Sequence, residues 1–233
     1  MWLSQRVRKV LSLGRFLAET ARHNGTYNPE SAVELAFSCE SIEPVQIRSE
    51  LIELARIVRE QRPRTMLEIG SATGGTLFVL CQMADPEATV VSIDLPGAAF
   101  GGGYGAYRIP IMRRLKQKRQ RLYLMRTNSH SPETSLRLQE ILRNAKIQFL
   151  FIDGDHSYDG VKQDFDIYSP LVAPGGIIGF HDIVKAPVAA GGEVNRFWNE
   201  IKSRFHYREI IADSDQVTCG IGLLFLENGG SSL

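Results

Sequence analysis

The stretch TMLEIGSATGGTLFVLCQMA, residues 65–84, decides the fold. Its first six residues are mostly apolar and predict a short buried strand over 65–70. Glycine and other small residues follow, as expected for a tight turn, and the apolar run from 75 to 84 predicts a helix. A strand, a turn and a helix in this order predict a βαβ unit, from which parallel sheets are built.

The same alternation continues along the chain. The further predicted strands cover 89–94, 121–127, 147–153 and 174–182, and the predicted helices cover 50–60, 131–142, 160–171 and 193–205. The last two apolar runs, 207–212 and 220–227, leave no room for a helix between them and predict an antiparallel pair. The fold class that follows is α/β, a Rossmann-like doubly wound sheet of seven strands, mostly parallel with an antiparallel last strand.

The length of 233 residues suits one α/β domain. We expect residues 1–45 to form an N-terminal helical extension and residues 46–233 to form the main domain. Apolar residues of the basic N-terminal segment fall near helical spacing, which predicts a helix that packs on the domain or on a second copy of the chain. A homo-oligomer is therefore one expectation.

Composition limits the partners and the compartment. A net charge of +1 gives no general attraction to nucleic acid, which is not an expected partner. No uncharged apolar run reaches about 18 residues, so no transmembrane helix is expected, and the N-terminus lacks the apolar stretch of a signal peptide. Three widely spaced cysteines without a C-x-x-C pair argue against a disulfide framework and fit a cytoplasmic protein.

Polar residues stand at the ends of five predicted strands. In open α/β sheets, ligands bind at the carboxyl ends of the strands, which lie at one edge. We therefore expect an active site at this edge. The residues concerned are Glu68 with Gly70, Asp94, Asn128 with Ser129, Asp153, and His181 with Asp182.

The turn after the first strand departs from a dinucleotide fingerprint. A G-x-G-x-x-G motif would need a second glycine where this chain has Ala72, which weakens the interpretation as an NAD-dependent oxidoreductase. Small residues still allow a ligand to approach the backbone, and Glu68 offers a carboxylate near the turn. Asp94 ends the second strand, where a carboxylate can accept hydrogen bonds from both hydroxyls of a ribose. Together these features predict an adenosine-containing ligand.

The chain resembles the class I S-adenosylmethionine-dependent methyltransferases. The resemblance is carried by this turn, the acidic Asp94, the motif TNSH at 127–130 and the motif FIDGDHSY at 151–158. The resemblance covers about residues 46–227. It implies S-adenosylmethionine as cofactor, with its methionine part against Gly70, Ser71, Thr73 and Gly74. Glu68 and Asp153 would also lie at the cofactor. The ribose would lie on Asp94 and the adenine beside Asn128 and Ser129.

Two neighbouring strand ends predict a cation site. Asp153 ends the fourth strand, and His181 with Asp182 ends the fifth. Two carboxylates that meet in a cleft repel each other unless a cation lies between them, and Mg²⁺ prefers such oxygen ligands. A cation can lower the pKa of a substrate hydroxyl, and a base can then accept the proton. His156 titrates in the range that this task requires.

The motif FIDGDHSYDGVKQDF together with LVAPGGIIGFHDI is similar to a branch of metal-dependent O-methyltransferases that act on sugar hydroxyls, the cephalosporin hydroxylase or rhamnosyl O-methyltransferase group. The resemblance implies Asp153 and Asp182 as metal ligands and His156 as the base, so that Asp153 and His156 form the catalytic pair. His181 stands where that branch often has a carboxylate. As a ligand it would favour Mn²⁺, Fe²⁺ or Zn²⁺ over Mg²⁺, and as a non-ligand it would only support the site.

The predicted function is therefore O-methylation of a small-molecule hydroxyl, on a sugar or a glycosylated natural product. The glycine-rich segment 97–105 predicts a lid over the substrate, or else a surface loop. The basic segment 108–126 is either a solvated surface or a site for an anionic acceptor. Two alternatives stay open: a non-catalytic adenosyl-binding partner protein, and a phosphohydrolase that uses the D-G-D-H motif.

Overall fold

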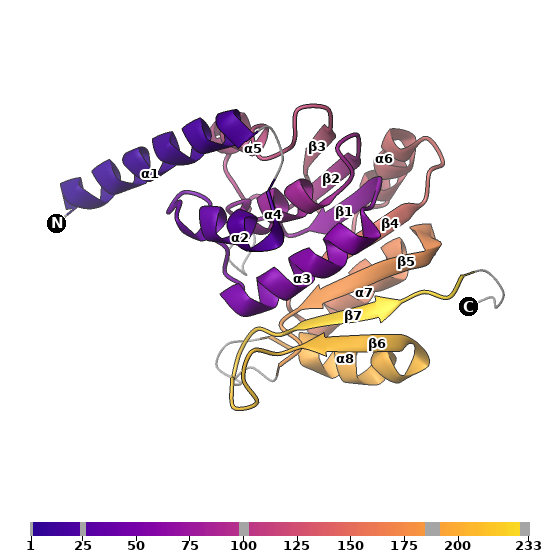
Figure 1. Ribbon diagram of the computed structural model, residues 1–233. Coiled ribbons are helices and arrows are strands. Elements are labelled where there is room, and N and C mark those ends of the chain that lie inside the picture. Colours follow the sequence, from indigo (N-terminus) through magenta and orange to yellow (C-terminus); the bar gives the residue numbers. More distant parts are fainter. Residues whose placement is uncertain (1, 24–26, 98–102, 185–191, 229–233) are drawn as a thin grey trace.

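A computed structural model describes residues 2–23, 27–97, 103–184 and 192–228. Seven strands form one sheet in the order β3-β2-β1-β4-β5-β7-β6 (Figure 1). Only β7 runs against its neighbours, β5 and β6. The predicted fold class is confirmed. The strands are β1 (Thr65–Ile69), β2 (Thr89–Asp94), β3 (Arg121–Arg126), β4 (Ile147–Ile152), β5 (Val172–His181), β6 (His206–Ile210) and β7 (Ile221–Phe225).

The helices cover both faces of the sheet. The α-helices are α1 (Trp2–His23), α2 (Pro29–Phe37), α3 (Arg48–Gln61), α4 (Gly75–Met83), α5 (Ile109–Met112), α6 (Pro132–Leu142), α7 (Tyr158–Tyr168) and α8 (Val194–Ile201). Helix α7 begins two residues earlier than expected because the side chain of Ser157 accepts a hydrogen bond from the N–H of Gly160 and caps it. Helix α8 ends earlier than expected, at Ile201, where a 3-10 turn replaces its last predicted residues.

Two hydrophobic cores lie on opposite faces of the sheet. One core joins β-strand residues such as Met66 to α2, α3 and α4. The other joins residues such as Leu67 to α6, α7 and α8. Neighbouring residues of β1 thus face opposite cores, as the alternation of side chains along a strand requires. Figure 1 shows the same three layers.

The N-terminal helices differ in how they pack. Helix α2 is part of the first core, through buried residues such as Val33. Helix α1 extends away from the body (Figure 1), and its second half packs there, with Phe16 edge-on to Phe78 at 5.0 Å. Val10 and Leu11 of its first half are 70% and 65% exposed. The predicted division at residue 45, and an oligomer formed through α1, stay predictions.

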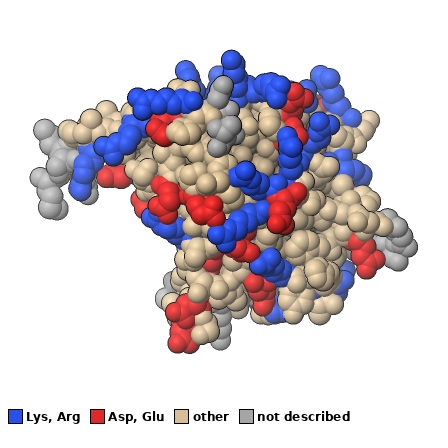
Figure 2. Space-filling model, in the orientation of Figure 1, with Lys and Arg blue, Asp and Glu red and all other residues tan. Residues whose placement is uncertain are grey.

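Positive charge gathers on one side of the molecule. In Figure 2, Lys and Arg side chains line the upper side of the view, over α5 and the segment that leads to β3. Arg108, in contrast, turns inward and donates to the main-chain oxygens of Ser41 and Thr73. Arg126 likewise donates to the main-chain oxygen of Tyr104 at 3.1 Å, so part of the predicted basic segment stabilises the fold. The exposed members are Arg113, Arg114, Lys118, Arg119 and Arg121.

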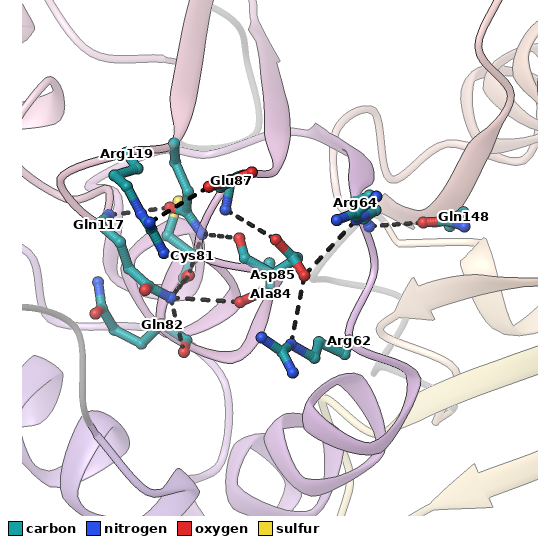
Figure 3. Close-up of polar contacts among 11 residues, drawn as sticks. Arg62, Arg64, Cys81, Gln82, Ala84, Asp85, Glu87, Gln117, Arg119 and Gln148 are labelled. Atoms are coloured by element: carbon teal, nitrogen blue, oxygen red, sulfur yellow. Dashed lines mark hydrogen bonds and ion pairs between the residues drawn. The ribbon is translucent and has the colours of Figure 1, made fainter.

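Two buried glutamines donate hydrogen bonds to the C-terminal end of α4, which lies away from the predicted site (Figure 3). Gln117 donates from Nε2 to the main-chain oxygens of Cys81 and Gln82, at 2.9 and 3.2 Å. Gln120 donates to the same Cys81 oxygen at 2.7 Å. The last carbonyl groups of a helix have no partner within it, so these amides supply the missing donors. Nearby, Asp85 forms ion pairs with both Arg62 and Arg64.

Among the described residues, no helix combines the length and the apolar character needed to cross a bilayer.

Candidate active site

The carboxyl ends of β1 and β4 meet at Gly70 and Asp153. The N–H of Asp153 donates to the oxygen of Ile69 at 2.8 Å. Gly70 has a φ of +88°, and a Cβ atom placed on it would lie 1.9 Å from the main-chain oxygen of Asp153. Only glycine tolerates both conditions. Gly70 therefore determines where the end of β4 lies, whatever its role toward a cofactor.

Other segments hold the turn between β1 and α4. Ala72 lies exposed at its tip with a φ of +42°, and its N–H donates to Oδ2 of Asp94 at 2.7 Å. The hydroxyl of Thr73 donates to the main-chain oxygen of Glu43 at 3.0 Å. Gly74, with a φ of +95°, precedes α4 and packs against α5. The turn is thus fixed from several sides, and Ala72 and Thr73 are its accessible part.

Glu68 is buried below this turn and is only 1% exposed. It accepts a hydrogen bond from the hydroxyl of Ser71, which lies 2.7 Å from that of Ser92. Burial raises the pKa of Glu68 to about 8, against the opposing effect of the Ser71 hydrogen bond, and the charges of Asp153 and Asp94 add to the rise. In this conformation Glu68 supports the turn through Ser71 and does not reach the surface itself.

Asp94 ends β2 as predicted, and it is 6% exposed. Burial raises its pKa, while hydrogen bonds from the N–H groups of Ala72 and Leu95 act in the opposite direction. Segment 103–105 lies close, because a Cβ atom on Gly103 would be 2.8 Å from Oδ1 of Asp94. Asp94 thus holds the turn after β1 and stands next to the position expected for a ribose. Residues 98–102 of the predicted lid lie outside the described part of the chain.

Hydrogen bonds fix the loop that follows β3. Oδ1 of Asn128 accepts from the N–H of His130 at 2.9 Å, and the main-chain oxygen of Ser129 accepts from the hydroxyl of Tyr168 at 2.6 Å. His130 lies 3.3 Å from the fully buried carboxylate of Asp164 in α7. A hydrogen bond and the charge of Asp164 raise the pKa of His130, although burial opposes the rise. Sequence analysis assigned no role to His130 or Asp164.

Asp153, His156, His181 and Asp182 meet where β4 and β5 end. Nε2 of His156 lies 3.4 Å from Oδ1 of Asp153, and Nδ1 of His156 lies 3.3 Å from Oδ2 of Asp182. Nδ1 of His181 donates to Oδ1 of Asp153 at 3.1 Å. One ligand atom each of Asp153, His156 and Asp182 falls within a mutual distance of 4.8 Å. The two strand ends therefore bring together all four residues that the sequence singled out.

The charges of this cluster balance one another. Burial alone would raise the pKa of Asp153, but the nearby His181 and His156 outweigh it and hold that pKa at about 2. Burial would lower the pKa of both imidazoles, yet the carboxylates raise the pKa of His156 and raise that of His181 well above its usual value. Both histidines thus favour the charged form in this cluster.

Two further residues at the cluster were missed by sequence analysis. Gln46 is buried and donates from Nε2 to Oδ2 of Asp153 at 2.7 Å. Cys219 has a free thiol and lies within 4.8 Å of ligand atoms of His181 and Asp182. Neither residue belongs to a motif, because each comes from a segment far away in the sequence. An isolated glutamine or cysteine gives no local signal.

Comparison with known proteins decides the family. Residues 67–183 match the family model described as "Methyltransferase domain". The chain belongs to this family. The match runs from β1 through the end of β5 and so includes the turn after β1 and the cluster at Asp153. The predicted membership in the class I S-adenosylmethionine-dependent methyltransferases is confirmed, and the narrower assignment to a sugar-modifying branch stays a prediction.

Solved structures of O-methyltransferases have the same fold as this methyltransferase domain. TomG from Streptomyces achromogenes, involved in tomaymycin synthesis and solved with SAM, has a TM-score of 0.54 at 18% identity, over 86% of this chain and 90% of that chain. The O-methyltransferase from Bacillus cereus, solved with SAH, has a TM-score of 0.55 at 17% identity, over 92% of this chain and 100% of that chain. At these identities the likeness establishes the fold.

A curated relative is much longer than this chain. The "Uncharacterized protein y4gI" of Sinorhizobium fredii (strain NBRC 101917 / NGR234) is 25% identical over 178 residues. The match covers 72% of this chain but 18% of that protein. The matched region thus spans less than a fifth of the length of this relative.

Proposed function

We propose that this methyltransferase uses S-adenosylmethionine and a divalent cation to methylate a hydroxyl group of a small molecule, with a sugar or a glycosylated natural product as the acceptor class. The meeting of Asp153, His156 and Asp182 within 4.8 Å carries the proposal. A methyltransferase that acts on carbon or sulfur has less need of two carboxylates and an imidazole at this edge, whereas a hydroxyl must lose a proton to attack.

The turn after β1 and the end of β2 fit the cofactor. S-adenosylmethionine supplies the electrophilic methyl group when bound. Ala72 and Thr73 form the accessible tip of the turn, and the Asp94 carboxylate lies directly beside it. Asp94 would accept hydrogen bonds from the ribose hydroxyls, while Gly70, Ser71 and Gly74 keep the turn close to the sheet. Asn128 and Ser129 follow β3 and would line the adenine. The cofactors named in the TomG and Bacillus cereus structures support this proposal.

The cluster at β4 and β5 fits a divalent cation. Two carboxylates converge there, with a ligand atom of His156 within the same 4.8 Å. We assign Asp153 and Asp182 as ligands, with His181 beside them. A bound cation lowers the pKa of an acceptor hydroxyl. His156 lies between the two carboxylates, whose charges raise its pKa. A cation bound by Asp153 and Asp182 would offset those charges and favour the neutral imidazole, which would then accept the hydroxyl proton at a ring nitrogen. The two carboxylates alone suit the expected Mg²⁺, whereas His181 as a further ligand would favour Mn²⁺ or Zn²⁺.

The acceptor and the cellular setting remain part of the proposal. The sugar preference rests on the resemblance of the D-G-D-H motif. The exposed Arg119 and Arg121 do not support an anionic acceptor, because they lie beside the starts of β2 and β3, at the edge of the sheet opposite the site. We infer a cytoplasmic location from the three free thiols, because such thiols persist in reducing compartments. A phosphohydrolase is disfavoured because Oδ1 of Asp155 accepts from the N–H of Ser157 and so serves a turn.

Two measurements test the proposal. Calorimetry measures binding of S-adenosylmethionine, and mass spectrometry detects methyl transfer to a panel of sugar and phenol acceptors in the presence of Mg²⁺, Mn²⁺ or Zn²⁺. Asp153→Asn should abolish transfer and keep the cofactor affinity, whereas Asp94→Asn should weaken cofactor binding. Binding of the cofactor without transfer to any acceptor would favour the non-catalytic alternative. Release of phosphate from a generic ester, with no response to the cofactor, would favour the hydrolase.

A further inference from the structure

Cys219 lies beside the cluster because of how β5 and β7 pair. His181, at the end of β5, is opposite Ile221, at the start of β7. The N–H of Val184 donates to the main-chain oxygen of Cys219 at 3.0 Å, and that of Ile183 donates to Gly220 at 3.3 Å. The turn before β7 therefore continues the strand pairing alongside residues 182–184. As a result, Cys219, His181 and Asp182 each place a ligand atom within 4.8 Å of the other two.

The histidine of this group has the environment of a metal ligand. His181 is 3% exposed, and its Nδ1 donates to Oδ1 of Asp153 at 3.1 Å. Its Nε2 is buried and has no hydrogen-bond partner among the described residues. Histidines that bind a metal through one ring nitrogen usually donate the other N–H to a carboxylate, which fixes the ring. Asp153 does this for His181 and leaves Nε2 unpartnered within the buried ring.

We propose that His181, Asp182 and Cys219 bind a thiophilic divalent cation of the zinc class. A thiolate and an imidazole prefer such a cation to Mg²⁺, which prefers oxygen ligands. Ligand atoms around tetrahedral zinc are about 3.3 to 3.6 Å apart. The ligand atoms of the group lie within 4.8 Å of one another, so small side-chain movements are enough to close it around an ion. Asp182 belongs both to this group and to the group of Asp153 and His156. The inference therefore rests on the proposed function in its choice of Asp182 as a ligand.

A buried carboxylate positions Cys219. Glu50 of α3 has no exposed surface, and it accepts from the N–H groups of Ala212 and Gly220 at 3.1 Å each. It also accepts from Nε2 of Gln216 at 2.7 Å. These three bonds span the loop between β6 and β7 and hold the residue after Cys219 in place. The thiol is therefore presented to His181 by a fixed loop.

Titration of the full chain with Co²⁺, after removal of metals with a chelator, tests this inference. Co²⁺ replaces Zn²⁺ and gives a near-ultraviolet absorption band only when a thiolate is bound. The wild-type chain should show this band. Cys219→Ser should lose this band. It should also bind Zn²⁺ at least about 10- to 100-fold more weakly, because mutation of a residue that merely orients a metal ligand already lowers metal affinity by that factor. Cys39→Ala and Cys81→Ala remove thiols in the first core and should keep the band.

A second measurement does not depend on the variants. Zn²⁺ should slow the reaction of the half-buried Cys219 with a thiol reagent in the wild-type chain, and Mg²⁺ should not. Absence of the Co²⁺ band, its persistence in Cys219→Ser, or equal protection by Mg²⁺ would each overturn the inference. Methyl transfer supported by Mg²⁺ without the band would leave the proposed function intact. The band without methyl transfer would support the cation site and contradict the proposed function.

Discussion

Gln46 donates a hydrogen bond from Nε2 to Oδ2 of Asp153 at 2.7 Å, across 107 residues of sequence. The amide is itself fixed, because its Oε1 accepts from the hydroxyl of Thr76 at 2.6 Å. Oδ1 of Asp153 is left to face His156 and His181. The segment just before α3 thus orients the carboxylate on which the proposed chemistry depends.

Gln46→Leu should lower kcat by about 10- to 100-fold, as the loss of residues that orient metal ligands does in other enzymes. Leucine keeps most of the volume but cannot donate to Asp153. Cofactor affinity should change little, because Gln46 does not touch the turn after β1 in any described contact. Steady-state kinetics and calorimetry measure the two effects. Gln61→Leu removes an amide that donates to Gly175 at the opposite edge, and it should leave kcat unchanged; equal losses in both variants would contradict this role for Gln46.

Gly70→Ala should destabilise the fold and displace Asp153. The new Cβ atom would lie 1.9 Å from the main-chain oxygen of Asp153, and the φ of +88° adds strain. We expect a loss of about 3 kcal/mol or more, as the sum of backbone strain and overpacking. Gly97→Ala is the matched control, because Gly97 has a φ of +78° with open space around it. It should cost about 1 to 2 kcal/mol. Urea unfolding distinguishes them, and similar losses would show that contact with Asp153 is unimportant.

Glu68 should make stability fall as pH rises. Its pKa is about 8 in the folded chain, above its ordinary value of 4.5, so the folded state binds the proton more tightly. The stabilisation is complete below pH 4.5 and is lost as pH rises through about 8. Relative to Glu68→Gln, which stays neutral, the wild-type free energy of unfolding should fall by up to about 1.4 kcal/mol per pH unit. Urea unfolding at several pH values measures this difference, and parallel profiles would show that Glu68 titrates normally.

The fold could be predicted from the sequence because each strand carries its own signal. The runs at 65–70, 89–94 and 147–153 are apolar on both faces, as strands covered by helices on both sides must be. Their boundaries differ from the observed strands by at most one residue. The start of α7 was less predictable, since the N-cap role of Ser157 depends on which of several polar residues turns toward the helix.

The site was predictable only where a residue follows a strand directly. Asp153, His181 and Asp182 are such residues, and the parallel sheet brings them together. Gln46 and Cys219 reach the same point through tertiary packing, which leaves no local pattern. For Glu68 the motif misleads in the other direction. Its position in the motif suggested contact with the cofactor, whereas the structure buries it under Ser71.

Glu50→Ala should loosen the loop between β6 and β7. The substitution removes the acceptor for the N–H groups of Ala212 and Gly220 and for Gln216. The N–H of Gly220 is buried, and a buried donor left without a partner costs about 1 to 3 kcal/mol, so the free energy of unfolding should fall by about that amount. Water can replace Glu50 at the part-buried donors of Ala212 and Gln216. Hydrogen exchange at Ala212 and Gly220 should speed up, while exchange in β1 follows global stability alone. Unchanged exchange at both amides would mean that the loop holds its shape without Glu50.

Gln117→Leu should destabilise the chain without impairing the site. Its amide donates to the last carbonyl groups of α4, which lie at the end of the helix away from the turn after β1 (Figure 3). In this variant the carbonyl of Cys81 still accepts a hydrogen bond from Gln120, whereas the carbonyl of Gln82 loses the one from Gln117. We expect a loss of about 1 to 3 kcal/mol in urea unfolding, with cofactor affinity unchanged at temperatures where the variant is folded. The exposed Gln139→Leu should stay within about 0.5 kcal/mol of wild type. A loss in Gln117→Leu no larger than that of Gln139→Leu would mean that water replaces the amide at the helix end.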